Sequence, residues 1–155
     1  MEIRGTGSYL PGKIITNDDL SEVVDTNDEW ISSRTGICQR HISEGETTSE
    51  MAAKAAVAAL EDAEVSPEEV ELILVATMTG DEAMPGTACK VQKEIGAVHA
   101  ACFDLSAACT GFVFALNTAN AYLASGMYRN ALVIGADMVS KVIDWTDPVS
   151  YTHLR

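Results

Sequence analysis

The chain has 155 residues and carries 23 acidic side chains against 10 Lys and Arg, for a formal net charge of −13. This acidic balance argues against nucleic-acid and membrane partners, because binding either through overall charge needs a basic surface. Apolar residues make up 47% of the chain and charged residues 21%, which is typical of one globular domain or a piece of a larger one. No apolar run approaches the roughly 20 residues of a membrane span. The N-terminus lacks the cationic and apolar segments of a signal peptide, so we expect a cytoplasmic location.

The N-terminal part of the sequence predicts one strand and three helices. Turn residues end the strand-like run, and Asn17 is expected to cap the first helix. Thr47 and Glu50 have the spacing of a capping box, and the helix after them carries one broad stripe of small apolar side chains. In chain order we predict a strand over 3–10, a helix over 18–24, a helix through Trp30 to Arg34 capped by Asn27 or Asp28, and a long helix that runs on to residue 63.

The remaining sequence alternates strand-like and helix-like segments. The run 71–77 is almost continuously apolar, which is typical of a strand buried on both faces. Such alternation predicts an α/β fold in which a mostly parallel, mixed sheet is flanked by helices. In chain order we predict a turn at 66–69, strands over 71–77, 100–105 and 131–136, a helix over 87–95, and a helix over 109–123 that packs through Phe112, Val113, Leu116, Ala119 and Leu123.

The four cysteines, Cys38, Cys89, Cys102 and Cys109, form no CxxC pair, and the chain has only three His. Structural zinc needs paired ligands at short spacing, so we expect no metal site. A disulfide framework is not expected in a cytosolic domain of this size. The default interpretation of each cysteine is a small buried hydrophobic side chain.

Cys109 departs from that default because of its position in the chain. A predicted strand ends, small residues turn the chain, and Cys109 opens the next predicted helix. The first turn of a helix has unpaired backbone N–H groups and the positive end of the dipole, and both favour a thiolate. The small neighbours let a substrate approach closely, as at the nucleophile elbow of hydrolases. The alternative is a buried structural cysteine near a helix start.

The segment AACTGF at 107–112 resembles the active-site motif of β-ketoacyl-acyl carrier protein synthase III, the initiating condensing enzyme of bacterial fatty acid synthesis. The resemblance covers about residues 3–147 and implies the thiolase-like fold, with residues 1–147 as its N-terminal half and a homodimer at full length. In that fold one helix layer is shared between the two halves. Further segments in register with the family are GTGSYLP at 5–11, DTNDEWI at 25–31, RTGI at 34–37, RHI at 40–42, VAT at 75–77 and PGTAC at 85–89.

The resemblance also implies roles for individual residues. Cys109 matches the family nucleophile, which takes an acyl group from acyl-coenzyme A. Trp30 and Arg34 match residues that hold coenzyme A, the indole by stacking on adenine, and Thr26 lies in the same signature. Without the surrounding signature, Trp30 would be interpreted as a core anchor for the short helix and Arg34 as a solvated charge. Met84 falls where the family has an apolar residue that reaches the partner subunit's acyl pocket, or it fills a gap in the dimer interface.

The implied activity is a Claisen condensation of a short acyl-coenzyme A with malonyl-acyl carrier protein, which needs no metal or redox cofactor. Two kinds of alternative remain. One is another thiolase-fold condensing enzyme, of the hydroxymethylglutaryl-coenzyme A synthase or polyketide synthase type. The other is a non-catalytic half-domain that pairs with a second chain.

The sequence departs from the family in two places. The catalytic His and Asn of the family belong to its C-terminal half, and none of His41, His99 and His153 matches them. We therefore expect a truncated, inactive fragment. From Pro148 the segment 148–155 does not resemble the family, and we interpret it as foreign sequence, with a natural degenerate C-terminus as the alternative.

Overall fold

The structure is a computed structural model that describes residues 1–144 and consists of two compact units. Unit 1 comprises Met1–Tyr9 and Thr47–Asp137, and unit 2 comprises Leu10–Glu46 together with the described residues from Met138 onward. The predicted foreign segment 148–155 lies outside the described residues. Within residues 1–144, no helix combines the length and the apolar content that a membrane crossing requires.

Unit 1 is built on a sheet of three parallel strands, in the order β4-β3-β5. These are β3 (Leu72–Ala76), β4 (Ala101–Leu105) and β5 (Leu132–Gly135). The last residue of β3, Ala76, is paired with the last residues of both neighbours, so the three strands end together at one edge of the sheet. The predicted parallel strands are confirmed: each observed bound lies within one residue of the prediction, and the end of β4 at Leu105 is as predicted.

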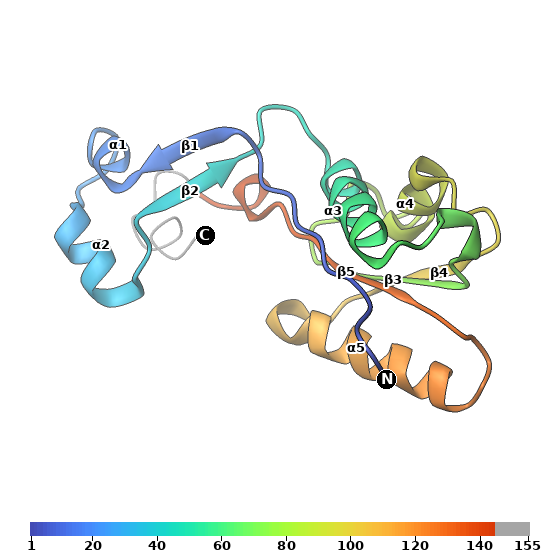
Figure 1. Cartoon of the computed structure of the whole chain (residues 1–155). Helices are drawn as coiled ribbons and strands as arrows, with labels where there is room; N and C mark the ends of the chain where they lie inside the picture. Colours follow the sequence, from blue (N-terminus) through green and yellow to red (C-terminus); the bar gives the residue numbers. More distant parts are fainter. Residues whose placement is uncertain (145–155) are drawn as a thin grey trace. The chain divides into compact units, whose positions relative to one another are not determined.

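Helices cover both faces of this sheet (Figure 1). On one face lie α3 (Thr48–Ala63) and α4 (Thr87–Ile95), and on the other lies α5 (Gly111–Ala124). All five residues of β3 are buried, because alternate side chains join the cores on opposite faces. The Thr47–Glu50 capping box and the predicted bounds of α4 are confirmed. A short 3-10 turn, Pro67–Glu69, leads into β3 where a turn was predicted.

The predicted strand over 3–10 is wrong. Residues 1–11 pair with no strand in the described chain, and residues 5–7 lie instead against the small-residue stripe of α3. A Cβ on Gly5 would come within 2.5 Å of the backbone N of Ala63, so only glycine allows this approach. The Thr6 N–H donates to the Asp62 carboxylate at 2.8 Å, which fixes the segment alongside α3.

The predicted packing face of α5 is also largely wrong. Its buried residues are the small ones, Gly111, Ala115 and Ala119, which follow each other at four-residue spacing. Phe112 and Val113, predicted to pack, are 46% and 58% exposed. The helix is apolar around most of its circumference, so apolar periodicity did not identify which side approaches the sheet.

Among the described residues of unit 2 there are two strands and two helices. The strands β1 (Lys13–Thr16) and β2 (Gln39–Ile42) pair antiparallel, and neither was predicted from the sequence. The helices are α1 (Asn17–Ser21) and α2 (Asp28–Thr35), and a 3-10 turn, Val139–Lys141, follows later in the chain. Asn27 caps α2 as predicted, whereas α1 is shorter than predicted and is capped by Thr16.

Asn17 does not cap the first helix as predicted. It is buried at the centre of a polar network in unit 2. Its side-chain amide donates to Asp28 Oδ1 and to the carbonyl of Ile37, both at 2.7 Å. It accepts a hydrogen bond from the guanidinium of Arg40, which is fully buried on β2. The network joins β2 to the start of both helices, so it fixes where α2 begins.

We expect purified residues 1–155 to self-associate, because α5 exposes three consecutive apolar side chains, Phe112, Val113 and Phe114, and exposed apolar surface promotes association. Replacing Val113 and Phe114 together by Ser should shift the chain toward monomer in size-exclusion chromatography with light scattering. Val57→Ser, at an equally apolar and 41% exposed position on α3, is the matched control and should change nothing. A monodisperse monomer of the unmodified chain would contradict this prediction.

Candidate active site

Cys109 lies at the edge of the sheet where the strands end. It is exposed, in a 3-10 turn over Ala108–Thr110 that connects the end of β4 to α5. Ala108 has φ of 45°, a left-handed conformation that non-glycine residues rarely adopt. The chain therefore turns sharply just before Cys109, as an elbow does. The predicted helix from Cys109 starts two residues later, at Gly111, because the 3-10 turn comes first. Since Cys109 is exposed, the interpretation as a buried structural cysteine does not hold.

Two glycines let the start of α5 lie close to the sheet. A Cβ on Gly111 would meet the Cβ of Ala76, at the end of β3, at 3.2 Å. A Cβ on Gly135, at the end of β5, would meet the ring of Phe112 at the same distance. Both contacts are tighter than ordinary packing, so larger residues would push the helix start, and Cys109 with it, away from the strand ends.

Asp104, in β4, ties this strand to the start of α4. Its carboxylate accepts the backbone N–H groups of Thr87 at 2.7 Å and Ala88 at 2.6 Å, which have no acceptor within the helix. Gly86 makes this approach possible, since a Cβ there would lie 2.9 Å from Asp104 Oδ2. Sequence reasoning missed this role, although an acidic residue inside an otherwise apolar strand was a visible signal.

Asp137, just after β5, holds the loop that follows β3. It accepts the backbone N–H of Met78 at 2.7 Å and the hydroxyl of Thr79 at 3.0 Å. Further along, Asp81 accepts the Ser49 hydroxyl at 2.6 Å, which ties the same loop to the start of α3. The loop is thus attached to two elements before it reaches α4. Neither carboxylate was singled out from the sequence.

Met84 lies in this loop and is 85% exposed, the highest value among the large exposed hydrophobic side chains of the described residues. Met84 and Cys109 both belong to unit 1. An apolar side chain with this exposure does not fill a gap between other residues of this chain. The prediction that it lies in an acyl pocket or a dimer interface stays a prediction.

Trp30 and Arg34 lie one helical turn apart on α2, in unit 2. The Arg34 guanidinium carbon is 4.6 Å from the centroid of the Trp30 ring, a cation–π contact. Trp30 is 38% exposed, whereas its neighbour Ile31 is fully buried, so Ile31 rather than Trp30 anchors the helix in the core. An aromatic face and a cation are thus presented together on one surface of α2.

Thr26 precedes α2 and is half-buried. Its hydroxyl oxygen is buried and has no hydrogen-bond partner among residues 1–144. The structure therefore brings Trp30, Arg34 and Thr26 into unit 2, and Cys109 and Met84 into unit 1.

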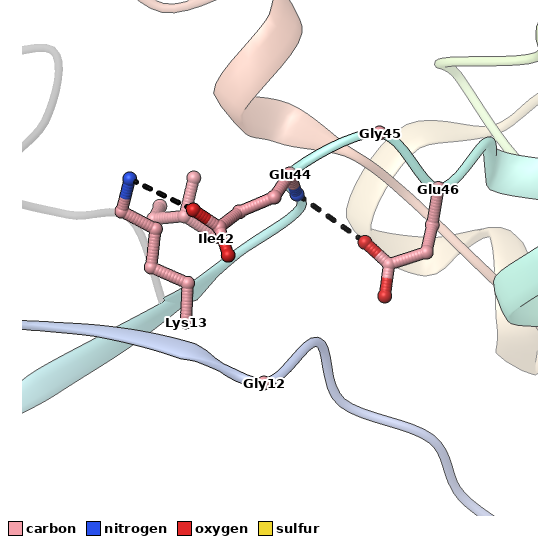
Figure 2. A pocket seen from close by; sticks show the side chains of 6 residues that line it. All are labelled: Gly12, Lys13, Ile42, Glu44, Gly45 and Glu46. Carbon is pink, nitrogen blue, oxygen red and sulfur yellow. Dashed lines mark hydrogen bonds and ion pairs between the residues drawn. The ribbon is translucent and has the colours of Figure 1, made fainter.

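A shallow hollow of about 330 Å³ lies where β1 begins and β2 ends (Figure 2). Lys13 Nζ and Glu44 Oε1 are 3.3 Å apart across it, and the Glu44 N–H donates to Glu46 Oε2 at 3.3 Å. No predicted site residue lines this hollow. Its lining residues are Gly12, Lys13, Ile42, Glu44, Gly45 and Glu46.

Comparison with known proteins identifies the family. The family model described as 3-oxoacyl-[acyl-carrier-protein (ACP)] synthase III matches residues 103–154. The β-ketoacyl-[acyl-carrier-protein] synthase III of Clostridium acetobutylicum is 58% identical over 147 residues, 95% of this chain and 45% of that protein. That of Lactococcus lactis is 55% identical over 146 residues, 94% of this chain and 45% of that protein. The chain belongs to the β-ketoacyl-acyl carrier protein synthase III family.

Solved structures agree with this assignment. The crystal structure of 3-oxoacyl-[acyl-carrier-protein] synthase III from Aquifex aeolicus has a TM-score of 0.96 and 48% identity, and the match covers 97% of this chain and 49% of that one. The priming β-ketosynthase of the R1128 polyketide pathway has a TM-score of 0.92 and 40% identity, over 95% of this chain and 44% of that one. The synthase III fold is thiolase-like, as predicted. The chain spans about 45% of the length of the curated relatives it matches.

The residues matched by the synthase III family model include the elbow, α5 and β5. Within residues 1–144, no three His, Cys, Asp or Glu side chains gather closely enough to hold a metal ion.

Because Ala108 adopts a strained backbone conformation, we expect the stability of the chain to be sensitive to substitution at this position. Ala108→Val should lower the free energy of unfolding by about 1–2 kcal/mol, because a β-branched side chain is strongly disfavoured at positive φ. Ala108→Gly, the matched control, should be tolerated, since glycine adopts this conformation freely. Urea unfolding of both variants measures the difference. Equal effects of Val and Gly would show that the turn does not adopt this conformation in solution.

Proposed function

We propose that this chain carries the acyl-accepting cysteine of a condensing enzyme that starts fatty acid synthesis. The observation that carries the proposal is the position of Cys109: it is exposed, on a sharp turn at the strand ends, and two residues before the start of α5. Small residues surround it, so a thioester carbonyl has room to approach. The names of the relatives support this reaction class.

In the proposed first step, the Cys109 thiolate attacks the carbonyl carbon of a short acyl-coenzyme A. The carbon–sulfur bond to coenzyme A breaks, coenzyme A leaves as its thiolate, and the acyl group stays on Cys109 as a thioester. Backbone N–H groups near Cys109 stabilise the negative oxygen of the tetrahedral intermediate.

In the proposed second step, malonyl-acyl carrier protein loses carbon dioxide, and the resulting carbanion attacks the acyl group on Cys109. The new carbon–carbon bond forms as the Cys109 thiolate leaves. We assign the decarboxylation to the His and Asn of the family's C-terminal half. Residues 1–155 alone are therefore expected to release no carbon dioxide from malonyl-acyl carrier protein.

We propose that α2 binds the nucleotide end of coenzyme A. The Trp30 indole offers a face on which adenine stacks, and Arg34 offers a fixed positive charge to a polyanionic ligand. The Thr26 hydroxyl, buried without a partner in the described chain, is positioned next to α2 and is a candidate contact for the nucleotide. At full length we propose a homodimer in which Met84 contributes to the partner's acyl pocket.

A second candidate function is the priming of polyketide synthesis. The observation in its favour is the 40% identity and TM-score of 0.92 to the R1128 priming β-ketosynthase. Both functions use the same cysteine and first step, so the acyl acceptor distinguishes them. A full-length parent that condenses with a polyketide carrier protein but not with the fatty acid carrier protein would favour this second function.

The acylation step is tested with labelled acetyl-coenzyme A and a full-length parent protein. Cys109→Ala should abolish acyl-enzyme formation, because no other thiol lies on the elbow. Cys38→Ala, Cys89→Ala and Cys102→Ala are matched controls and should retain it. Label retained on the Cys109→Ala protein would overturn the assignment, and absence of label on every form would favour a non-catalytic half-domain.

The coenzyme A contact is tested by calorimetric titration of the same full-length protein. Trp30→Ala should weaken binding by about 1–3 kcal/mol, as loss of base stacking does elsewhere. Arg34→Ala should also weaken binding, and more so at low ionic strength, because its contribution is electrostatic. Glu29→Ala, a neighbouring exposed position on α2, is the control. Unchanged affinity in both variants would make Trp30 and Arg34 structural.

A further inference from the structure

Two cysteines outside the proposed catalytic machinery lie in contact. Cys89 is on α4 and Cys102 is on β4, and their sulfur atoms are 3.5 Å apart. Both are free thiols. Among the described residues, no sulfur contact is found for Cys38 or Cys109. Cys89 and Cys102 are therefore considered together as a pair of neighbouring thiols.

The helix and strand that carry the pair are fastened to each other on both sides of it. Before Cys89, the start of α4 is tied to Asp104. After Cys89, the Gln92 side-chain amide donates to the carbonyl of Ala100 at 2.6 Å, and its Oε1 lies 3.2 Å from the Cys102 sulfur. Because both elements are held, bringing the two sulfurs together costs little conformational entropy.

The two thiols differ in access. Cys89 is exposed, whereas Cys102 is only partly accessible. Burial, the neighbouring Cys89 thiol and the Asp104 carboxylate raise the pKa of Cys102 to about 11. Cys102 therefore stays protonated at neutral pH, and an oxidant in solution reaches Cys89 first.

We propose that Cys89 and Cys102 are a reversible redox site that forms an intrachain disulfide by exchange with a low-molecular-weight disulfide of the glutathione type. In the first step the Cys89 thiolate attacks one sulfur of the glutathione disulfide and releases one glutathione thiolate. In the second step Cys102 loses its proton and attacks the Cys89 sulfur, which releases the second glutathione. Two protein thiols are oxidised by two electrons, and one glutathione disulfide is reduced to two thiols.

The bond would fasten α4 to the strand that leads to the elbow. β4 ends at Leu105, and the turn with Cys109 follows directly. Oxidation thus acts on the same elements that Asp104 holds, without consuming Cys109. The site goes beyond the proposed function, because it involves neither the acyl group nor coenzyme A.

The test uses residues 1–155 with Cys38→Ser and Cys109→Ser, so that only the pair remains. The reduced protein is equilibrated in buffers of increasing glutathione disulfide, quenched with acid, alkylated and mapped by mass spectrometry under non-reducing conditions. We expect a product with no disulfide between chains that has lost two hydrogen atoms, with the Cys89 and Cys102 peptides joined and no glutathione attached. A further Cys102→Ser change should stop the reaction at a glutathione adduct on Cys89.

Closure of a preformed Cys89–glutathione adduct should accelerate about tenfold for each pH unit well below the pKa of Cys102, because only the thiolate attacks. Glutathione that persists on Cys89 while Cys102 stays free, or a disulfide between two chains, would overturn the proposal. If the Ser variants do not fold, the same mapping of the unmodified chain decides. In the unmodified chain, a main disulfide other than Cys89–Cys102 would also overturn the proposal.

Discussion

The structure of unit 1 depends on one constraint: β3 is buried along its whole length on both faces. A strand without an exposed face needs a hydrogen-bonded neighbour on each side and helices above and below. Parallel neighbours, β4 and β5, satisfy the first need, and α3, α4 and α5 satisfy the second. Because all three strands are parallel, their ends meet at one edge, and the turn with Cys109 follows the end of β4 there.

Carboxylates keep these loops in place. Asp104 accepts two backbone N–H groups at the start of α4, and Asp137 accepts N–H and hydroxyl groups from the loop after β3. Backbone groups at a helix start have no partner within the helix, so a charged acceptor there is both a cap and a tether. The elbow at Ala108 can hold its left-handed turn because the surrounding elements are fixed in this way.

Much of this arrangement was predictable from the sequence. The bounds of α4 were correct because Gly96, with φ of 78°, ends the helix as glycine commonly does. The strands β3, β4 and β5 were visible as short apolar runs. The elbow followed from small residues around a cysteine after a strand, and α2 from Asn27 before an acidic first turn.

The errors have physical causes. Residues 3–10 have the pattern of a strand, but a strand forms only where a partner strand is available, and here Gly5 and Gly7 pack on α3 instead. The packed face of α5 was misassigned because close approach selects small residues, not the most apolar ones. The roles of Asp104 and Asp137, and the contact between Cys89 and Cys102, arise from residues that only the tertiary fold brings together, so no local pattern announced them.

Hydrogen exchange in the first turn of α4 tests the tethering of this edge most directly. The N–H groups of Thr87 and Ala88 have no acceptor in their own helix, so slow exchange there requires the Asp104 carboxylate. We predict that both exchange about as slowly as the amides of β3, and that Asp104→Ala returns them to the rate of an open loop while β3 stays protected. Rapid exchange of Thr87 and Ala88 in the unmodified chain would contradict the arrangement of the sheet edge, and with it the fixed position of Cys109.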